Sequence, residues 1–295
     1  MDVFDPVLGN GCCTPGAKGI TWHPIKTATN GQLALGMTRW IIENKAYNAD
    51  YLGFTNYKAA VAGGFASYTG ATFLVIDDES SANNGKLMTA ADAGLTEPEA
   101  DPAAKTKPTY YVVMDAEKNE AALNTDAKRG LIDFEGEVNG IKVRSAFLYL
   151  KDSAFSNTMD EYAEICGVPR ETIEDVAREF TSHGVKAATT GLGSTAAANG
   201  VSSMAAYTFL NALIGSNQMI GGMVAPRVGA ATTTDGKRYK LSTIAGKPAL
   251  TDAKNCQNIG RTKRIWKKTD EYKNRVAAGE TDPKPLLPWF SHTGV

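Results

Sequence analysis

The chain has 295 residues, of which 43% are hydrophobic and 21% are charged. This composition is typical of a globular protein and excludes an intrinsically disordered one. The formal net charge of -1 gives no basic excess, so we expect no nucleic-acid partner, and no apolar run approaches the ~18 residues of a membrane span.

The four cysteines are too few and too scattered for a disulfide scaffold, and the three histidines lie far apart in the sequence. Cys12 and Cys13 are adjacent, a spacing that suits neither a mutual disulfide nor a tetrahedral metal site. We therefore predict no metal ligand in this chain.

Residues 1–46 have the order of elements expected at the end of an α/β domain. A strand at Val3–Asp5 ends in an aspartate, and a Gly-rich loop follows at Gly9–Gly19. Helical spacing of apolar residues then predicts a helix at Gln32–Lys45, with Asn30 as its cap.

Residues 47–153 are interpreted as an excursion of short strands and surface loops. Apolar runs rich in β-formers predict strands at Ala71–Ile76 and Tyr110–Met114, with the polar stretch Asp77–Lys107 between them. A further extended segment is expected at Ile141–Tyr149.

Residues 154–225 are predicted to form a second α/β unit. One helix begins at Thr158 and closes at Gly167, and a second begins at Arg170 and ends at Gly184. We expect these helices to lead directly into a strand of a parallel sheet.

That strand is predicted at Val185–Thr190, followed by a loop of small residues at Gly191–Gly200 and an apolar helix at Val201–Ile214. Ligands bind at the carboxyl ends of strands in such units. Residues 226–295 are interpreted as a polar, turn-rich tail that leads to a missing C-terminal domain, with a short helix near Thr269–Ala278.

The loop sequence Gly191-Leu192-Gly193-Ser194-Thr195-Ala196 satisfies the GxGxxA pattern of dinucleotide-binding turns. The acid that should follow about twenty residues later, to hold a ribose, is absent. An NAD-dependent dehydrogenase that uses this loop and a purely structural glycine turn both remain open. No GxSxG, GxxxxGK[ST] or HExxH motif occurs, so the sequence offers no catalytic residue.

Several segments together resemble the molybdopterin oxidoreductases of the dimethyl-sulfoxide-reductase superfamily. They are DPVLGNG, WHPIKTATNGQLALGM and LNALIGSNQMIGGM. Within the superfamily, YAEICGVPRETIEDVAREF and RTKRIWKK are most similar to the tetrathionate-reducing catalytic subunits, of which this chain resembles a central fragment.

The resemblance implies a parallel-sheet, Rossmann-like α/β domain with a strand- and loop-rich insertion. It also implies two molybdopterin guanine dinucleotides around one molybdenum. The family's nucleotide-facing aspartate matches Asp5, its Gly-Thr-Asp matches Ala28, Thr29 and Asn30, and its Gly-rich loop matches Gly191, Leu192, Gly193, Ser194 and Ala196. Asn30 thus replaces an aspartate, and Ala28 replaces a glycine.

For the intact enzyme, the resemblance implies reductive cleavage of the S–S bond of tetrathionate in anaerobic respiration. A [4Fe–4S] cluster is expected only in upstream sequence. Two partner subunits are expected, one for iron–sulfur electron transfer and one that anchors the enzyme in the membrane, with a periplasmic location. This fragment alone is expected to be inactive. The alternatives are reduction of arsenate or selenate, and a non-enzymatic docking module.

Overall fold

The computed structural model describes residues 1–8, 19–99, 109–191, 199–224, 270–281 and 283. The chain divides into two compact units, Met1–Pro226 and Arg227–Val295. Most of the predicted loop at Gly9–Gly19, and the turn-rich stretch that begins the tail, lie outside the described residues. In the second unit, the helix expected near Thr269–Ala278 is confirmed as α10 (Asp270–Ala277). The division into four regions stays a prediction.

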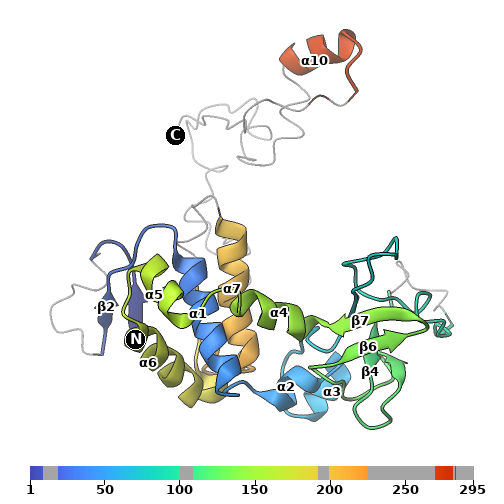
Figure 1. Ribbon diagram of the computed structural model, residues 1–295, viewed down its shortest axis with the longest axis horizontal. Coiled ribbons are helices and arrows are strands. Elements are labelled where there is room, and N and C mark those ends of the chain that lie inside the picture. Colours follow the sequence, from blue (N-terminus) through green and yellow to red (C-terminus); the bar gives the residue numbers. More distant parts are fainter. Residues whose placement is uncertain (9–18, 100–108, 192–198, 225–269, 282, 284–295) are drawn as a thin grey trace, which may run out of the picture. The chain divides into compact units, whose positions relative to one another are not determined.

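The first unit contains all the other described elements (Figure 1). Its helices are α1 (Asn30–Glu43), α2 (Ala49–Gly53), α3 (Tyr57–Ala62), α4 (Ala146–Ala154), α5 (Met159–Cys166), α6 (Arg170–Ser182), the 3₁₀ turn η1 (Gly184–Lys186) and α7 (Gly200–Leu213). Its strands are β1 (Asp2–Phe4), β2 (Thr21–His23), β3 (Leu74–Ile76), β4 (Val112–Met114), β5 (Ala121–Leu123), β6 (Glu135–Val138) and β7 (Ile141–Ser145).

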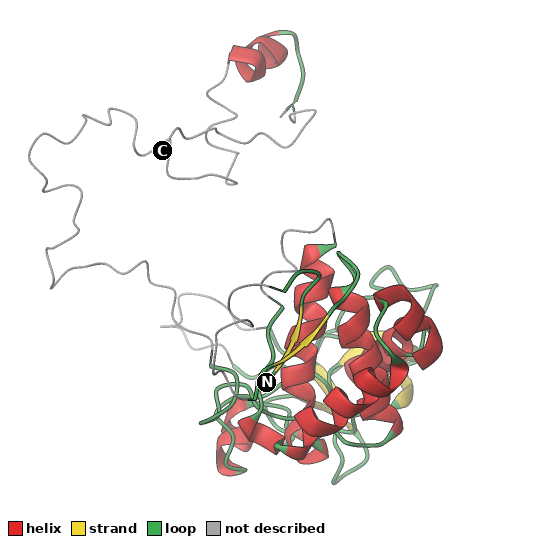
Figure 2. Cartoon of the chain, turned by 90° about the vertical axis from the view of Figure 1, so that its left-hand side faces the viewer, coloured by secondary structure: helices red, strands yellow, loops and turns green. Residues whose placement is uncertain are grey.

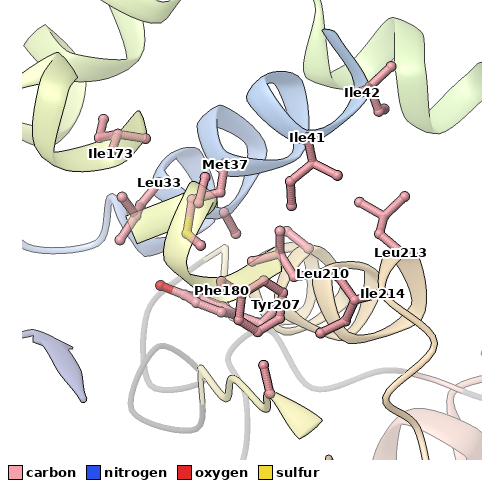
Figure 3. Packing of buried hydrophobic residues seen from close by; sticks show 14 of the residues in the cluster. Leu33, Met37, Ile41, Ile42, Ile173, Phe180, Tyr207, Leu210, Leu213 and Ile214 are labelled. Atoms are coloured by element: carbon pink, nitrogen blue, oxygen red, sulfur yellow. The ribbon is translucent and has the colours of Figure 1, made fainter. Parts of the chain in front are cut away.

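Helix α1 lies at the centre of the helical part and contacts α4, α5, α6 and α7. Leu33, Met37 and Ile41 form its buried stripe, as the helical spacing predicts. Figure 3 shows Ile41 directed toward Leu210 of α7, in the core shared by the two helices. The predicted cap is wrong, because Thr29 occupies the cap position and Asn30 is the first helical residue.

Helices α5 and α6 form where local signals predict them. Thr158 and Glu161 make a reciprocal capping box at the start of α5, and Gly167 ends the helix in the left-handed conformation at φ 66°. The two helices pack against the core that surrounds α1. Both predicted helices are therefore confirmed.

The sheets of the first unit are small. Strands β3, β7 and β6 form one antiparallel sheet, and β4 pairs with β5 in another. Strands β1 and β2 pair in parallel, with Asp2 opposite Thr21 and Phe4 opposite His23 (Figure 2). The fold is mixed α/β, but this pair is the only parallel pairing in the described residues, so they do not form the predicted parallel Rossmann-like sheet.

The strand predicted at Val185–Thr190 is wrong. Its first residues belong to η1, and the rest form no regular element and pair with no strand among the described residues. Asn211 of α7 takes the place of a partner strand: the Thr189 N–H donates to Asn211 Oδ1 at 2.9 Å, and Asn211 Nδ2 donates to the Thr189 carbonyl at 2.8 Å. The buried side-chain amide of Asn211 therefore makes the two hydrogen bonds to the Thr189 backbone that a neighbouring strand would make in a sheet.

The predicted excursion contains the expected strands but also three helices, α2, α3 and α4. The extended segment expected at Ile141–Tyr149 is wrong beyond Ser145, where β7 passes directly into α4. A short apolar run such as AFLYL fits either a strand or a buried helix, so its pattern does not decide between them. No helix in the part of the chain that the structure describes has the length and apolar character of a membrane span.

Candidate functional site

The turn before α1 holds three of the residues matched to the cofactor site. Ala28 lies in the left-handed region at φ 65°. The Thr29 hydroxyl donates to the Lys26 carbonyl at 2.7 Å, and it does not cap α1. A left-handed turn leads directly into an uncapped helix N-terminus, whose first N–H groups have no partner from the helix itself.

The conformation of Ala28 explains why a glycine suits this position, since glycine adopts positive φ without the steric cost that a Cβ brings. We expect Ala28→Gly to raise the free energy of unfolding of the first unit by about 1 kcal/mol, partly offset by the greater freedom of glycine in the unfolded chain. Urea denaturation followed by circular dichroism measures the change. The control is Ala59→Gly inside α3, which is expected to lower stability by roughly 1 kcal/mol. A loss of stability with Ala28→Gly contradicts the prediction.

The second matched segment leads to the N-terminus of α7. Its residues Leu192, Gly193, Ser194 and Ala196 lie outside the described residues, whereas Gly191 and Asn199 are placed. Asn199 is at the cap position of α7, but its side chain does not cap the helix. Its Nδ2 instead donates to the Ala28 carbonyl at 3.2 Å, across 171 residues of sequence. The exit of the Gly191 loop therefore contacts the turn before α1.

Helices α1 and α7 run in the same direction. Near their first turns, a Cβ added to Gly31 would lie 2.7 Å from Ser203 Oγ. Beyond their last turns, the Asn48 N–H donates to the Leu213 carbonyl at 2.7 Å. The two uncapped N-termini thus lie side by side, an arrangement that favours an anion such as a phosphate.

Gly191 is a glycine for a packing reason. An added Cβ would lie 2.2 Å from the ring of Tyr207, which is buried at 7% exposure. Burial, with the neighbouring Cys166, raises the pKa of Tyr207 to about 12. The absence of a side chain at Gly191 therefore makes room for the ring of Tyr207, and the proposed contact of Gly191 with a cofactor stays a prediction.

Cys166 lies under the same turn. Its Sγ donates to the Thr29 carbonyl at 3.6 Å, and burial raises its pKa to about 11. A thiol with this pKa is protonated at neutral pH and is a poor nucleophile. Cys166 is therefore a packing residue of the turn and not a catalytic one.

Asp5 follows β1 and is exposed, with one carboxylate oxygen accepting from the Val7 N–H at 2.9 Å. The Trp22 indole donates to its carbonyl at 2.9 Å. Within the described residues, the hydrogen bonds of Asp5 reach neither the turn at Ala28–Asn30 nor Gly191. Among the described residues, the structure thus brings Asn199, at the exit of the Gly191 loop, to the turn at Ala28–Asn30, and it shows no such contact for Asp5.

A cavity of about 770 Å³ extends from this junction, between α1, α4 and α7. Gly31, Gln32 and Asn199 line it, and in the described part of the chain Gln32 Oε1 is a buried acceptor without a hydrogen-bond partner. A smaller pocket of about 270 Å³ lies on the other side of α7, beside Gly191 and Tyr207. A buried acceptor without a partner, next to two helix N-termini, fits a ligand that has both phosphate and N–H groups.

The sequence did not single out Gln32, Asn199, Tyr207 or Asn211. For Asn199 and Asn211 a signal was present. Asn199 directly precedes an apolar helix, and Asn211 is a polar residue inside one. A buried polar side chain must find a partner, so such positions mark places where the backbone or a ligand is held.

Comparison with curated proteins adds independent evidence. The chain is 32% identical over 271 residues to a tetrathionate reductase subunit of Salmonella typhimurium, an alignment that covers 91% of this chain and 25% of that protein. It is 35% identical over 209 residues to a selenate reductase subunit of Mesobacillus selenatarsenatis, an alignment that covers 70% of this chain and 19% of that protein. It is 28% identical over 159 residues to a sulfite dehydrogenase subunit of Allochromatium vinosum, an alignment that covers 54% of this chain and 15% of that protein. No protein-family model matches the chain.

These relatives are molybdopterin oxidoreductases, and the chain belongs to this family. The chain spans about a quarter or less of the length of the relatives it matches. The resemblance inferred from the sequence motifs is thereby confirmed at the level of the family.

Proposed function

We propose that the chain forms one wall of the cofactor cleft in a molybdenum-dependent reductase that binds molybdopterin guanine dinucleotide. The observation that supports this most is the contact of Asn199 with Ala28, which places the uncapped N-termini of α1 and α7 side by side. The family implies a cofactor with pyrophosphate and guanine groups. This junction offers backbone N–H groups to the pyrophosphate and side-chain amide acceptors to the guanine.

In this proposal the chain binds and orients the cofactor. The N–H groups at the start of α1 and α7 hold the pyrophosphate, and the Asn30 side chain accepts a hydrogen bond from the guanine edge. Asp5 and the residues 192–196 are proposed to complete the contact. Molybdenum, once bound, supplies the electron transfer to the substrate. A parallel Rossmann-like sheet, a second nucleotide and a [4Fe–4S] cluster are proposed for the intact enzyme.

Calorimetric titration of the 295-residue chain with GDP tests the nucleotide site, because GDP carries the same guanine and diphosphate groups. We expect saturable binding, at least about tenfold tighter than that of ADP, since one good pair of hydrogen bonds to a base is worth roughly 1–3 kcal/mol. Asn30→Ala is expected to remove this preference. The control is Asn44→Ala at the other end of α1, where the side chain donates to the Trp40 carbonyl.

Equal and weak binding of both nucleotides would count against the guanine site. Saturable binding of NADH with no binding of GDP would favour the dehydrogenase alternative for the Gly191 loop.

For the intact enzyme we propose reductive cleavage of the S–S bond of tetrathionate in the periplasm, with electrons delivered from a membrane anchor through an iron–sulfur protein. The relative whose alignment covers 91% of this chain is a tetrathionate reductase subunit, which supports tetrathionate as the substrate. Selenate is the second candidate, supported by the relative with 35% identity. Anaerobic growth of the source organism with and without this gene, on tetrathionate or on selenate as electron acceptor, distinguishes them. Loss of growth on tetrathionate alone is expected.

A further inference from the structure

Lys26 lies two residues before Ala28, between strand β2 and the turn that leads into α1. Its backbone N–H donates to the Cys166 carbonyl at 2.8 Å, and its Nζ donates to the Glu164 carbonyl at 2.7 Å. We propose that Lys26 is a positioning residue of the nucleotide site, because it fixes the Ala28–Asn30 turn on the C-terminus of α5. This inference rests on the proposed function of the site.

The C-terminus of α5 suits a lysine side chain. The last four carbonyl groups of a helix have no partner within the helix and lie at the negative end of its dipole. In α5, Lys26 alone donates to two of these four, to one through its backbone and to the other through its ammonium group. Gly167 leaves room for the lysine, since a Cβ added there would lie 3.1 Å from both Lys26 Cγ and Lys26 Cε.

The main chain of Lys26 also closes the turn. Its carbonyl accepts from the Thr29 hydroxyl at 2.7 Å and from the Thr29 N–H at 3.3 Å. The Thr29 carbonyl in turn accepts from Cys166 Sγ at 3.6 Å. Lys26 and Thr29, the two ends of the turn, are therefore both bonded to Cys166, and the left-handed Ala28 lies between them.

Lys26 acts on the ligand only through this turn. Helix α5 packs beside α1 (Figure 1), but neither Lys26 nor any residue of α5 lines the two cavities described above. The Ala28 carbonyl accepts from the Asn199 side chain at the start of α7. The place that Lys26 gives the turn therefore sets the position of the first N–H groups of α1 relative to those of α7. These are the groups proposed to hold the pyrophosphate.

Lys26→Met tests this role, because methionine keeps an apolar stem over Gly167 and removes the ammonium group. In the 295-residue chain, we expect the dissociation constant of GDP to rise about tenfold, the lower end for a hydrogen bond to a charged group. Amide hydrogen exchange of residues 28–33 is expected to become faster in the ligand-free chain. Lys26→Arg keeps a cationic donor at the helix C-terminus and should restore both properties. The control Lys58→Met, in α3, removes the same charge from an exposed position and should change neither.

Unchanged affinity for GDP in Lys26→Met would overturn the proposal. Weaker binding of GDP with unchanged exchange in the ligand-free chain would overturn it as well, because Lys26 would then contact the phosphates directly. If the wild type binds no GDP, the proposed function fails, and the exchange measurement alone decides. Faster exchange in residues 28–33 of Lys26→Met then still supports Lys26 as the residue that holds the turn, and unchanged exchange rejects it.

Discussion

Replacing Gly222 by alanine is expected to destabilise the first unit by about 3 kcal/mol, the upper range for overpacking a closely packed site. An added Cβ would lie 2.3 Å from the Ser216 carbonyl oxygen and 2.5 Å from that of Val185. Both atoms belong to the main chain, so no side-chain rotation relieves the clash. The turn that follows α7, in which the Met223 N–H donates to the Ser216 carbonyl at 3.0 Å, would have to open.

The neighbouring Gly221 supplies the control for this substitution. It has φ 84°, and the nearest atoms to an added Cβ belong to the Lys186 side chain at 3.5 Å. Gly221→Ala should therefore bring only the steric cost of a left-handed alanine, roughly 1–2 kcal/mol. Urea denaturation followed by circular dichroism compares the two variants. Equal losses of stability would contradict the contact between Gly222 and the two carbonyl groups.

Replacing Leu210 by alanine is expected to cost about 3 kcal/mol, within the range of roughly 2–5 kcal/mol for a leucine removed from a core. Leu210 is fully buried between α1 and α7. Because the same interface brings the two helix N-termini together, the substitution should also weaken binding of GDP at the proposed site.

Val201→Ala in the same helix is the matched control. Val201 is 88% exposed, so its truncation should change the free energy of unfolding by less than about 0.5 kcal/mol. The measurement is again the urea midpoint of the first unit. A similar loss for both variants would contradict the packing of α7 on α1.

The helices were the most predictable part of the fold, because their signals are local. The Thr158 capping box, the left-handed Gly167 and the apolar spacing of α6 each need only a few neighbouring residues. The strand predicted at Val185–Thr190 depended on a distant partner. The structure supplies that partner as a side chain of α7, which no pattern around the segment could indicate.

The candidate site was predicted only in part, for a similar reason. The motif resemblance pointed to Ala28–Asn30 and to the Gly191 loop, but not to the residues that join them. Asn199 contacts Ala28, which lies 171 positions away in the sequence, and tertiary packing alone determines this contact. The sequence also did not indicate the left-handed conformation of Ala28, because alanine is an unusual residue for that conformation.

The hydrogen bond from the Asn199 side-chain amide to the Ala28 carbonyl joins two residues that lie 171 positions apart in the sequence. A ligand held by both ends of that stretch binds the folded chain and not the unfolded one, so occupancy and folding are thermodynamically linked. At a ligand concentration about a hundred times the dissociation constant, this linkage adds ~2.7 kcal/mol to the free energy of unfolding. Cofactor insertion would then act as the last step of folding, and molecules that had not received the cofactor would be the first to be unfolded and degraded.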